Sequence, residues 1–303
     1  MKPYWETVTF ENAYAPIKVY ALDSDEPGKI SILTQNANES DIRCSCTSGF
    51  MHCHSYLEML YILEDNTRIV INGFEFYADT GDLILINQYD IHEVQWPKRH
   101  WVLLIDPTRI FHMPHKEIHA IFPRSASHKH IRHIDYPTPS ADRMRSTFEA
   151  LIASLKSSSN HGSPETTGQF YLLLNAIRAY TALSEENPVD VIPLSHQKVI
   201  HEVLVYLDEH YHNPVTLDEI ALRAGVTPNY FCRFFKRITG RSLMSYLNEL
   251  RCQRARDLIE GTELPITTIA FDTGFASASY FNRKFREHWG TSPSKFRGRQ
   301  GKT

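Results

Sequence analysis

The chain has 303 residues, of which 42% are hydrophobic and 22% charged, as is typical of a folded chain of about two domains. It has no run of 18 apolar residues, and its N-terminus carries charges and prolines where a signal peptide needs an apolar core, so we expect neither a membrane span nor secretion. The five cysteines follow no disulfide framework, which indicates reduced thiols and a cytoplasmic protein.

The net charge of −3 conceals an uneven distribution. Residues 195–303 contain 16 Lys and Arg against 11 Asp and Glu, whereas residues 1–194 contain 16 against 24. The basic half is therefore the one expected to bind a polyanion such as DNA.

The N-terminal part, up to about residue 110, has the pattern of short β-strands. Clusters of β-branched and aromatic residues between turn residues predict strands at 17–22, 30–34, 56–63, 68–77, 82–87 and 101–105. Within 68–77, Asn72-Gly73 predicts a type I′ hairpin turn. Regular short strands with hairpins favour a barrel or a sandwich.

A group of histidines and acidic residues lies among these strands. His52, His54, Glu58 and His92, with Gly81-Asp82 between them, have the order HxHx₃E…GD…H. This order resembles the two motifs of the cupin barrel, in which the three histidines and the glutamate bind iron, manganese or zinc. The second motif departs from the cupin pattern, because Asn87-Gln88-Tyr89 replaces the usual Pro-x-Gly turn. We therefore predict no bound cofactor: the four residues line a small-molecule pocket or satisfy one another in the barrel, with a metal site as the alternative.

Other polar and aromatic residues give weaker signals. Six histidines follow no ligand spacing and predict a solvated surface: His112, His115, His119, His128, His130 and His133. Cys44, Cys46 and Cys53 match no common zinc motif. Trp5, Trp96 and Trp101 could stack on the face of a sugar.

Two amphipathic helices are predicted at 140–156 and 166–183. Their apolar stripes would pack either on their own domain or against a second copy of the chain. The acidic, proline-containing segment 184–195 predicts a linker.

Residues 216–297 contain the same helical unit twice. With one extra residue in the second copy, nine positions are identical: Ile220/Ile269, Ala221/Ala270, Gly225/Gly274, Tyr230/Tyr280, Phe231/Phe281, Arg233/Arg283, Phe235/Phe285, Gly240/Gly290 and Ser242/Ser292. In the first copy, Thr216 and Glu219 form a capping box, Gly225 ends the helix, and Thr227-Pro228 begins the next one. Each copy therefore predicts a helix, a tight turn and a second helix.

The outward face of each second helix carries amide, hydroxyl, thiol and basic side chains. These are Asn229, Cys232, Arg233 and Lys236 in the first copy, and Ser279, Asn282, Arg283 and Arg286 in the second. Arg can bond guanine, and Asn adenine, in the major groove. A helix predicted at 242–260 would be roughly 28 Å long. Because successive major grooves are about 34 Å apart, it could hold both recognition helices in adjacent grooves.

Residues 197–297 resemble the DNA-binding domain of the AraC/XylS family of bacterial transcription regulators. The matching positions are Ile269, Ala270, Gly274, Phe275, Ser279, Tyr280, Phe281, Arg283, Phe285, Gly290, Ser292, Pro293, Phe296 and Arg297. The resemblance implies DNA contacts from the eight outward residues named above. Cys232 departs from the family, which more often has Ser or Gln there, and this affects the base preference of the first helix.

The resemblance also implies a two-domain α+β organisation. A cupin-like all-β effector-binding barrel at 1–139 is followed by a helical pair at 140–183, a linker at 184–195, an all-α DNA-binding domain at 196–297 and a tail at 298–303. In this family the helical pair often forms the dimer contact, so a homodimer is one expected partner. Double-stranded DNA, RNA polymerase and a small effector are the others, and no membrane partner is expected.

The function that follows is a ligand-responsive transcription regulator, by family an activator that senses a sugar or sugar derivative, and not an enzyme. One alternative is a metal-dependent cupin enzyme joined to a DNA-binding domain. Another is a regulator controlled by a partner protein or by thiol oxidation.

Overall fold

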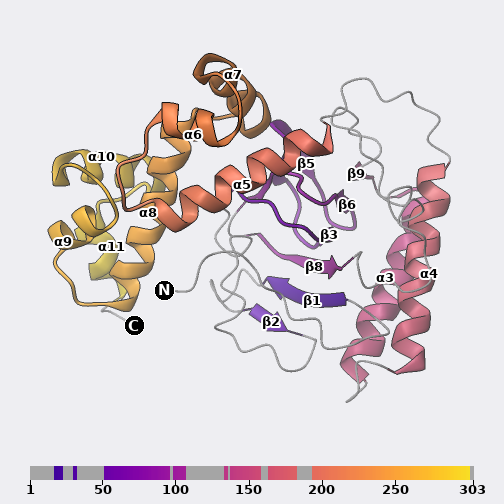
Figure 1. Cartoon of the computed structure of the whole chain (residues 1–303). Helices are drawn as coiled ribbons and strands as arrows, with labels where there is room; N and C mark the ends of the chain where they lie inside the picture. Colours follow the sequence, from indigo (N-terminus) through magenta and orange to yellow (C-terminus); the bar gives the residue numbers. More distant parts are fainter. Residues whose placement is uncertain are drawn as a thin grey trace. The chain divides into compact units, whose positions relative to one another are not determined.

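We describe a computed structural model of the chain (Figure 1). It describes residues 17–22, 30–32, 51–95, 98–106, 133–135, 137–157, 163–182 and 193–300. The chain divides into two compact units with the boundary after Lys198, and they are called here the N-terminal unit and the C-terminal unit. Among these described residues, no helix is long and apolar enough to cross a membrane.

The N-terminal unit contains two antiparallel sheets. Their strands are β1 (Ile17–Leu22), β2 (Ile30–Ile32), β3 (Leu57–Ile62), β4 (Thr67–Ile71), β5 (Phe74–Ala78), β6 (Leu83–Ile86), β7 (His92–Val94), β8 (His100–Ile105) and β9 (His133–Ile134). The larger sheet has the order β2-β1-β8-β3-β6-β9, and the smaller has the order β5-β4-β7. The predicted strands are confirmed with small differences at their ends. The short strands β7 and β9 were not predicted.

Alternation along β3 assigns its side chains to two cores. Leu60 and Ile62 are buried in one cluster with Ile69 and Ile71 of the smaller sheet, so this cluster lies between the two sheets. Glu58 shares their face, because residues two apart on a strand point the same way. An acidic side chain is thus directed into the interior between the sheets.

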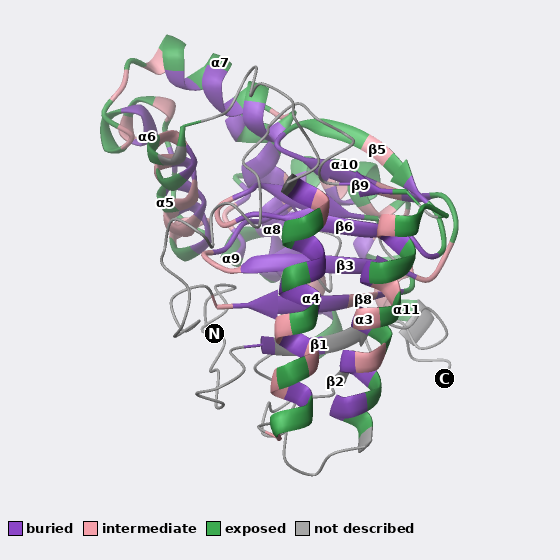
Figure 2. Cartoon of the chain, turned by 90° about the vertical axis from the view of Figure 1, so that its right-hand side faces the viewer, coloured by how far each residue is buried: buried purple, intermediate pink, exposed green. Residues whose placement is uncertain are grey.

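The opposite face of the larger sheet is covered by α3 (Pro139–Ser157) and α4 (Pro164–Ala182), as Figure 2 shows. Phe148 on α3 and Phe170 on α4 are fully buried in one cluster with Met59 of β3. The Tyr61 hydroxyl donates a hydrogen bond of 2.9 Å to Glu149 Oε1. The apolar stripes predicted at 140–156 and 166–183 therefore form the core of their own unit.

Trp101 also packs on this helix-covered face of the larger sheet. Lys156 Nζ lies 5.0 Å from the centre of its ring. Trp101 therefore does not face the interior that holds Glu58, and its stacking on a sugar stays a prediction. Trp5 and Trp96 lie outside the described residues.

The hairpin between β4 and β5 has the predicted turn. Asn72 and Gly73 have φ values of 50° and 83°, and Ile71 pairs with Phe74 across them. Two consecutive residues with positive φ define a type I′ turn, whose twist suits a two-residue hairpin.

The C-terminal unit is helical. Its elements are α5 (Leu194–His210, which begins in the N-terminal unit), α6 (Leu217–Arg223), α7 (Pro228–Thr239), α8 (Leu243–Gly261), α9 (Ile266–Asp272), α10 (Ala278–Trp289) and α11 (Pro293–Gln300). The pairs α6–α7 and α9–α10 are the two predicted helix-turn-helix motifs, and α8 contacts elements of both. α5 was not predicted, and it begins two residues before the end of the segment expected as a linker.

The helix ends follow the predicted signals with one difference. Thr216 caps α6 by accepting the Glu219 amide at 3.2 Å, and Thr227 caps α7 in the same way. The second half of the capping box does not form, because the Glu219 carboxylate accepts from the Tyr206 hydroxyl. Gly225 ends the first helix with a φ of 68°, which a residue without a Cβ adopts at little cost.

The repeated phenylalanines form the buried sides of the two recognition helices. Phe231 and Phe235 are fully buried with ring centres 5.5 Å apart, and Phe281 and Phe285 repeat both features. Burying these rings on one side of each helix leaves the polar side of α7 and α10 in solvent.

Candidate effector site and DNA-binding surface

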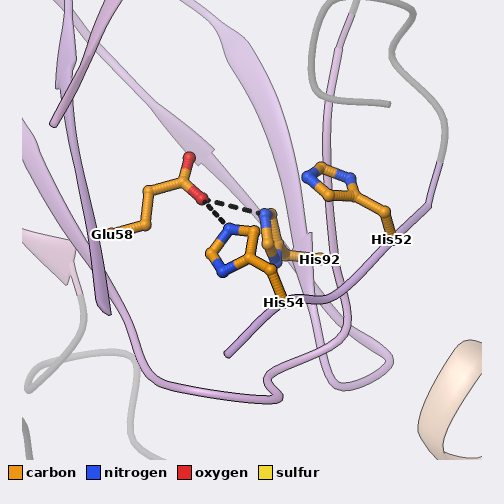
Figure 3. Close-up of side chains that lie close together, drawn as sticks. All are labelled: His52, His54, Glu58 and His92. Atoms are coloured by element: carbon orange, nitrogen blue, oxygen red, sulfur yellow. Dashed lines mark hydrogen bonds and ion pairs between the residues drawn. The ribbon is translucent and has the colours of Figure 1, made fainter. Parts of the chain in front are cut away.

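Four polar side chains meet in the interior of the N-terminal unit (Figure 3). Glu58 Oε2 accepts a hydrogen bond from His54 Nε2 at 2.7 Å and lies 3.1 Å from His92 Nε2. The ring of His52 lies 4.1 Å from the ring of His92, centre to centre. All four residues are more than nine-tenths buried. The structure thus brings together the four residues that the sequence assigned to an effector pocket.

The backbone explains why residues 40 positions apart meet. The His52 amide donates to the His92 carbonyl at 2.9 Å, and the His92 amide donates back to the His52 carbonyl at 2.8 Å. Glu58 comes from β3 of the larger sheet, whereas His92 lies on β7 of the smaller one. Since a bridge of this kind aligns two backbone segments, it also places their side chains next to one another.

Burial and charge oppose each other at the centre of the site. Burial alone would raise the pKa of Glu58, but His92 and His54 outweigh it and hold that pKa well below its usual range. Burial alone would lower the pKa of His92, but the Glu58 carboxylate outweighs it and raises that pKa. The carboxylate form of Glu58 and the protonated form of His92 therefore stabilise each other across this contact.

A turn next to the site holds His92 in place. His92 Nδ1 donates to the Asp90 carbonyl at 2.9 Å. The Asp90 carboxylate accepts from the Asn87 amide at 2.9 Å, from Asn72 Nδ2 at 2.7 Å and from Gln197 Nε2 at 3.0 Å. Sequence reasoning missed Asp90 and Gln197, and it predicted Asn72 only as a turn residue. No motif marks their hydrogen bonds to one another, because the partners are distant in the chain.

This turn lies where the sequence departs from the cupin pattern. Tyr89 has a φ of 62°, in the left-handed region where the usual glycine would be unstrained. Its amide donates to the His54 carbonyl at 2.7 Å. The turn is therefore formed without glycine, and its backbone is bonded to the other histidine segment of the site.

The four residues fit a divalent transition-metal ion. Their ligand atoms all lie within 4.8 Å of one another, and three imidazoles with one carboxylate suit zinc, iron or manganese. The Nδ1 atoms of His54 and His92 point to the carbonyls of Tyr56 and Asp90, at 3.2 Å and 2.9 Å. With the Nδ1–H groups donated, Nε2 would be the ligand atom once it releases its proton to an incoming ion, and both Nε2 atoms face the Glu58 carboxylate.

One nearby sequence expectation needs correction, and it concerns His133. Asp82 of the Gly81-Asp82 pair lies outside the four-residue site, and its carboxylate accepts from His133 Nε2 at 2.6 Å. His133 was expected on a solvated surface, but it is buried in β9 and its ring stacks on Phe76. With Asp135 at 3.2 Å, Asp82 and His133 form a separate cluster. The other five histidines of that group lie outside the described residues.

The described cysteines differ in exposure. Cys53 and Cys252 are buried and form no disulfide among the described residues, and burial raises the pKa of each above its usual value. A protonated buried thiol is a poor nucleophile and metal ligand. Cys232 is exposed on α7. Cys44 and Cys46 lie outside the described residues.

The second helix of each motif exposes most of the residues expected to contact DNA. Seven of the eight are exposed, namely Asn229, Cys232, Arg233, Lys236, Ser279, Arg283 and Arg286. Asn282 is half-buried, and its Nδ2 donates to the Ala278 carbonyl at 2.9 Å. Its amide is therefore partly engaged by its own helix. Arg237, which was not counted among the contact residues, is also exposed on α7.

Arg283 is exposed and only weakly paired, as a side chain that contacts a base must be. Its side chain is 64% exposed, and its nearest carboxylate, that of Glu287, is 3.9 Å away. The guanidinium lies over the Tyr280 ring at 5.1 Å. An exposed ion pair of this length adds little stability, so Arg283 has no large structural role within the helix.

Comparisons with known proteins agree with both halves of this description. Residues 47–174 match the family model of the AraC-like ligand binding domain, and residues 220–299 match that of a helix-turn-helix domain. The regulatory protein SoxS of Escherichia coli K12 is 35% identical over 106 residues, which cover 35% of this chain and 99% of SoxS. The chain belongs to the AraC/XylS family. It is thus a transcription regulator with a ligand-binding domain and a DNA-binding domain.

Other known proteins match over different lengths. The transcriptional activator RhaS of Escherichia fergusonii is 27% identical over 254 residues, which cover 81% of this chain and 86% of RhaS. The solved DNA-binding domain of AdpA, in complex with a target DNA, is 27% identical with a TM-score of 0.32 and covers 34% of this chain and 96% of that one. RhaS is named a transcriptional activator and AdpA a global transcriptional factor.

Proposed function

We propose that His52, His54, Glu58 and His92 form the effector site of this regulator, and that the effector is a small polyhydroxylated molecule such as a sugar or sugar derivative. The observation that carries the proposal is the convergence of these four buried side chains in the unit that matches a ligand-binding domain. A carboxylate and imidazoles can accept from and donate to neighbouring hydroxyl groups. The apolar residues between the two sheets supply the remaining walls of such a site.

On the DNA side, we propose that α7 and α10 each enter a major groove. The eight residues expected from the sequence are the proposed contacts, with Asn282 requiring a rotamer change to present its amide. We further propose that the bound regulator activates transcription through RNA polymerase. The likeness to RhaS, which is named an activator, across 81% of this chain supports this direction.

A homodimer through 140–183 is also part of the proposal. Since the apolar stripes of α3 and α4 are buried against the larger sheet, a dimer contact would use the outward face of the pair. Leu172 on α4 is 56% exposed and is a candidate centre for that contact.

A second candidate effector is a divalent metal ion at the same four residues. The donor set and the Nδ1 contacts of His54 and His92 favour it. A bound ion would supply a Lewis acid that holds oxygen atoms of a further small molecule. The same site would also serve the alternative of a metal-dependent enzyme joined to a DNA-binding domain.

A thermal-shift screen of the full chain tests these candidates. Sugars, sugar phosphates, organic acids and the divalent ions of zinc, iron and manganese are added separately to the wild type, to Glu58→Gln and to a control, Glu75→Gln, on exposed β5. A ligand at 100 times its Kd stabilises the folded state by about 2.7 kcal/mol. We expect a shift with one class of sugar that Glu58→Gln abolishes and Glu75→Gln keeps.

Other outcomes separate the candidates. A shift with zinc or iron alone, lost in Glu58→Gln, would favour the metal. A shift that Glu58→Gln leaves intact would place the effector elsewhere and refute the assignment of the site.

A further inference from the structure

Asp90 occupies a central position between the four-residue site and the rest of the chain. Its carbonyl accepts from His92 Nδ1. A ligand that displaces the His92 imidazole would therefore also displace the Asp90 backbone. Its carboxylate is 1% exposed and accepts from three donors. Two of them, the Asn87 amide and Asn72 Nδ2, belong to the turns beside the site. The third is Gln197 Nε2, which lies 107 residues further along the chain.

Gln197 lies in the first turns of α5 and is counted with the N-terminal unit. Its side chain is 5% exposed. Among the described residues, its other amide atom, Oε1, has no hydrogen-bond partner. Lys198, the next residue, places its Nζ 5.7 Å from the centre of the Tyr89 ring, on the same turn as Asp90. The start of α5 is therefore attached to the turn that holds His92.

The same helix continues past the boundary of the two units. α5 runs without a break from Leu194 to His210, and the boundary falls after Lys198. Near its other end, the buried Asp208 carboxylate pairs with Arg254 of α8. One helix thus carries Gln197 near its start, and near its other end it contacts α8 of the C-terminal unit.

We propose that the Asp90–Gln197 hydrogen bond makes the state of α5, and so DNA binding, depend on the occupancy of the four-residue site. This proposal rests on the proposed function only in naming that site as the effector site. A sugar hydroxyl and a divalent ion would both act on His92, so either would use the same connection. By thermodynamic linkage, the factor by which bound effector changes DNA affinity equals the factor by which bound DNA changes effector affinity.

The physical reason is that the Asp90 carboxylate is buried and needs its donors. A hydrogen bond to a buried charged group is worth more than one between neutral groups, and a donor lost there is not replaced by water. When His92 shifts, the Asp90 backbone and carboxylate shift with it. The two donors in the adjoining turns move with Asp90, whereas Gln197 is held by α5. The strain therefore falls on the Gln197 contact.

Hydrogen exchange of the full chain, read by mass spectrometry over residues 199–206, tests the connection without any ligand or operator. His92→Leu removes the donor to the Asp90 carbonyl, and Gln197→Met removes the donor to the carboxylate while keeping the length of the side chain. We expect each single variant to speed exchange of α5 by roughly tenfold. In the Gln197→Met background, adding His92→Leu should increase the exchange rate of α5 by less than about twofold. Ser195→Ala, an exposed change in the same turn, should leave exchange at the wild-type rate.

Two results would overturn the proposal. In the first, His92→Leu does not change the exchange rate of α5. In the second, His92→Leu speeds that exchange by the same factor in the wild type and in Gln197→Met. If His92→Leu does not fold by circular dichroism, Glu58→Gln perturbs the same imidazole through its Nε2 and takes its place. Failure of the proposed function is read separately, as the absence of any thermal shift in the ligand screen. The exchange result does not depend on which ligand the site takes.

Discussion

Gly274 and Gly225 occupy equivalent positions in the two helix-turn-helix motifs, yet their surroundings differ. Both have positive φ, at 89° and 68°. A Cβ added at Gly225 would meet nothing within 4 Å. At Gly274 it would lie 2.6 Å from the Tyr211 carbonyl oxygen and 2.9 Å from Arg251 Nε. Neither neighbour can move freely, because Arg251 Nε itself donates to the Tyr211 carbonyl at 2.7 Å.

The two alanine variants should therefore have different costs. Positive φ costs an alanine about 1–2 kcal/mol, and this is the whole expected effect of Gly225→Ala. Gly274→Ala adds overpacking against a backbone atom, about 1–3 kcal/mol. It also disturbs the Arg251 hydrogen bonds to Tyr211 and Asn213. The expected total is about 3–5 kcal/mol, enough to open the second motif at ordinary temperature.

Native-state hydrogen exchange over α9 and α10 of the full chain measures this cost locally. Gly225→Ala serves as the matched control, since the backbone strain is common to both variants. We expect protection over α9 and α10 to fall by the stated free energy in Gly274→Ala and to stay unchanged in Gly225→Ala. Equal losses of protection in the two motifs would show that the close approach to Tyr211 does not determine stability.

The remaining predictions concern DNA contacts and pH. Arg283→Ala should cost about 1–3 kcal/mol in operator binding and relax preference at one base position, and an unchanged preference in a selection from random sequences would show that Arg283 reads no base. Lys236→Ala should weaken binding to all sequences alike and reduce the slope of log K against log salt by about one, measured by fluorescence anisotropy; a sequence-dependent loss would argue for base contact instead. Burial lowers the pKa of His100 below its usual 6.5, so the unfolded chain binds this proton more readily and stability should be lost as pH falls below about 6.5. The loss reaches about 1.4 kcal/mol for each unit of pKa depression, and His100→Asn, which keeps a donor for the Lys98 carbonyl, should flatten the dependence of urea midpoints on pH. An unaltered slope in His100→Asn would assign the effect to other groups.

Local signals predicted the local structure well. The caps at Thr216 and Thr227, the glycine after α6 and the Asn72-Gly73 turn depend on interactions within a few residues, and each is observed. Where a distant partner intervened, prediction was wrong. The Glu219 carboxylate bonds to Tyr206 instead of completing its box.

The histidines illustrate the same division. His52 and His54 are two residues apart, so the HxH motif alone brings them near one another, but the meeting with His92 depends on a bridge between segments 40 residues apart. His133 was expected in solvent because its neighbours in sequence are polar, whereas strand pairing with β6 buries it beside Asp82. The residues next to a histidine in the sequence do not indicate which distant residues will contact it in the fold.

The sequence by itself determined the family, the duplicated DNA-binding motif and the four residues of the candidate site. Each of these can be recognised from the spacing or the repetition of residues along the chain. Tertiary structure alone decided that the α3 and α4 stripes cover a sheet, that Trp101 faces those helices and that Asp90 joins His92 to Gln197. These features depend on which face of a strand or helix meets which distant neighbour. That choice is made by packing of the whole unit, and no local pattern encodes it.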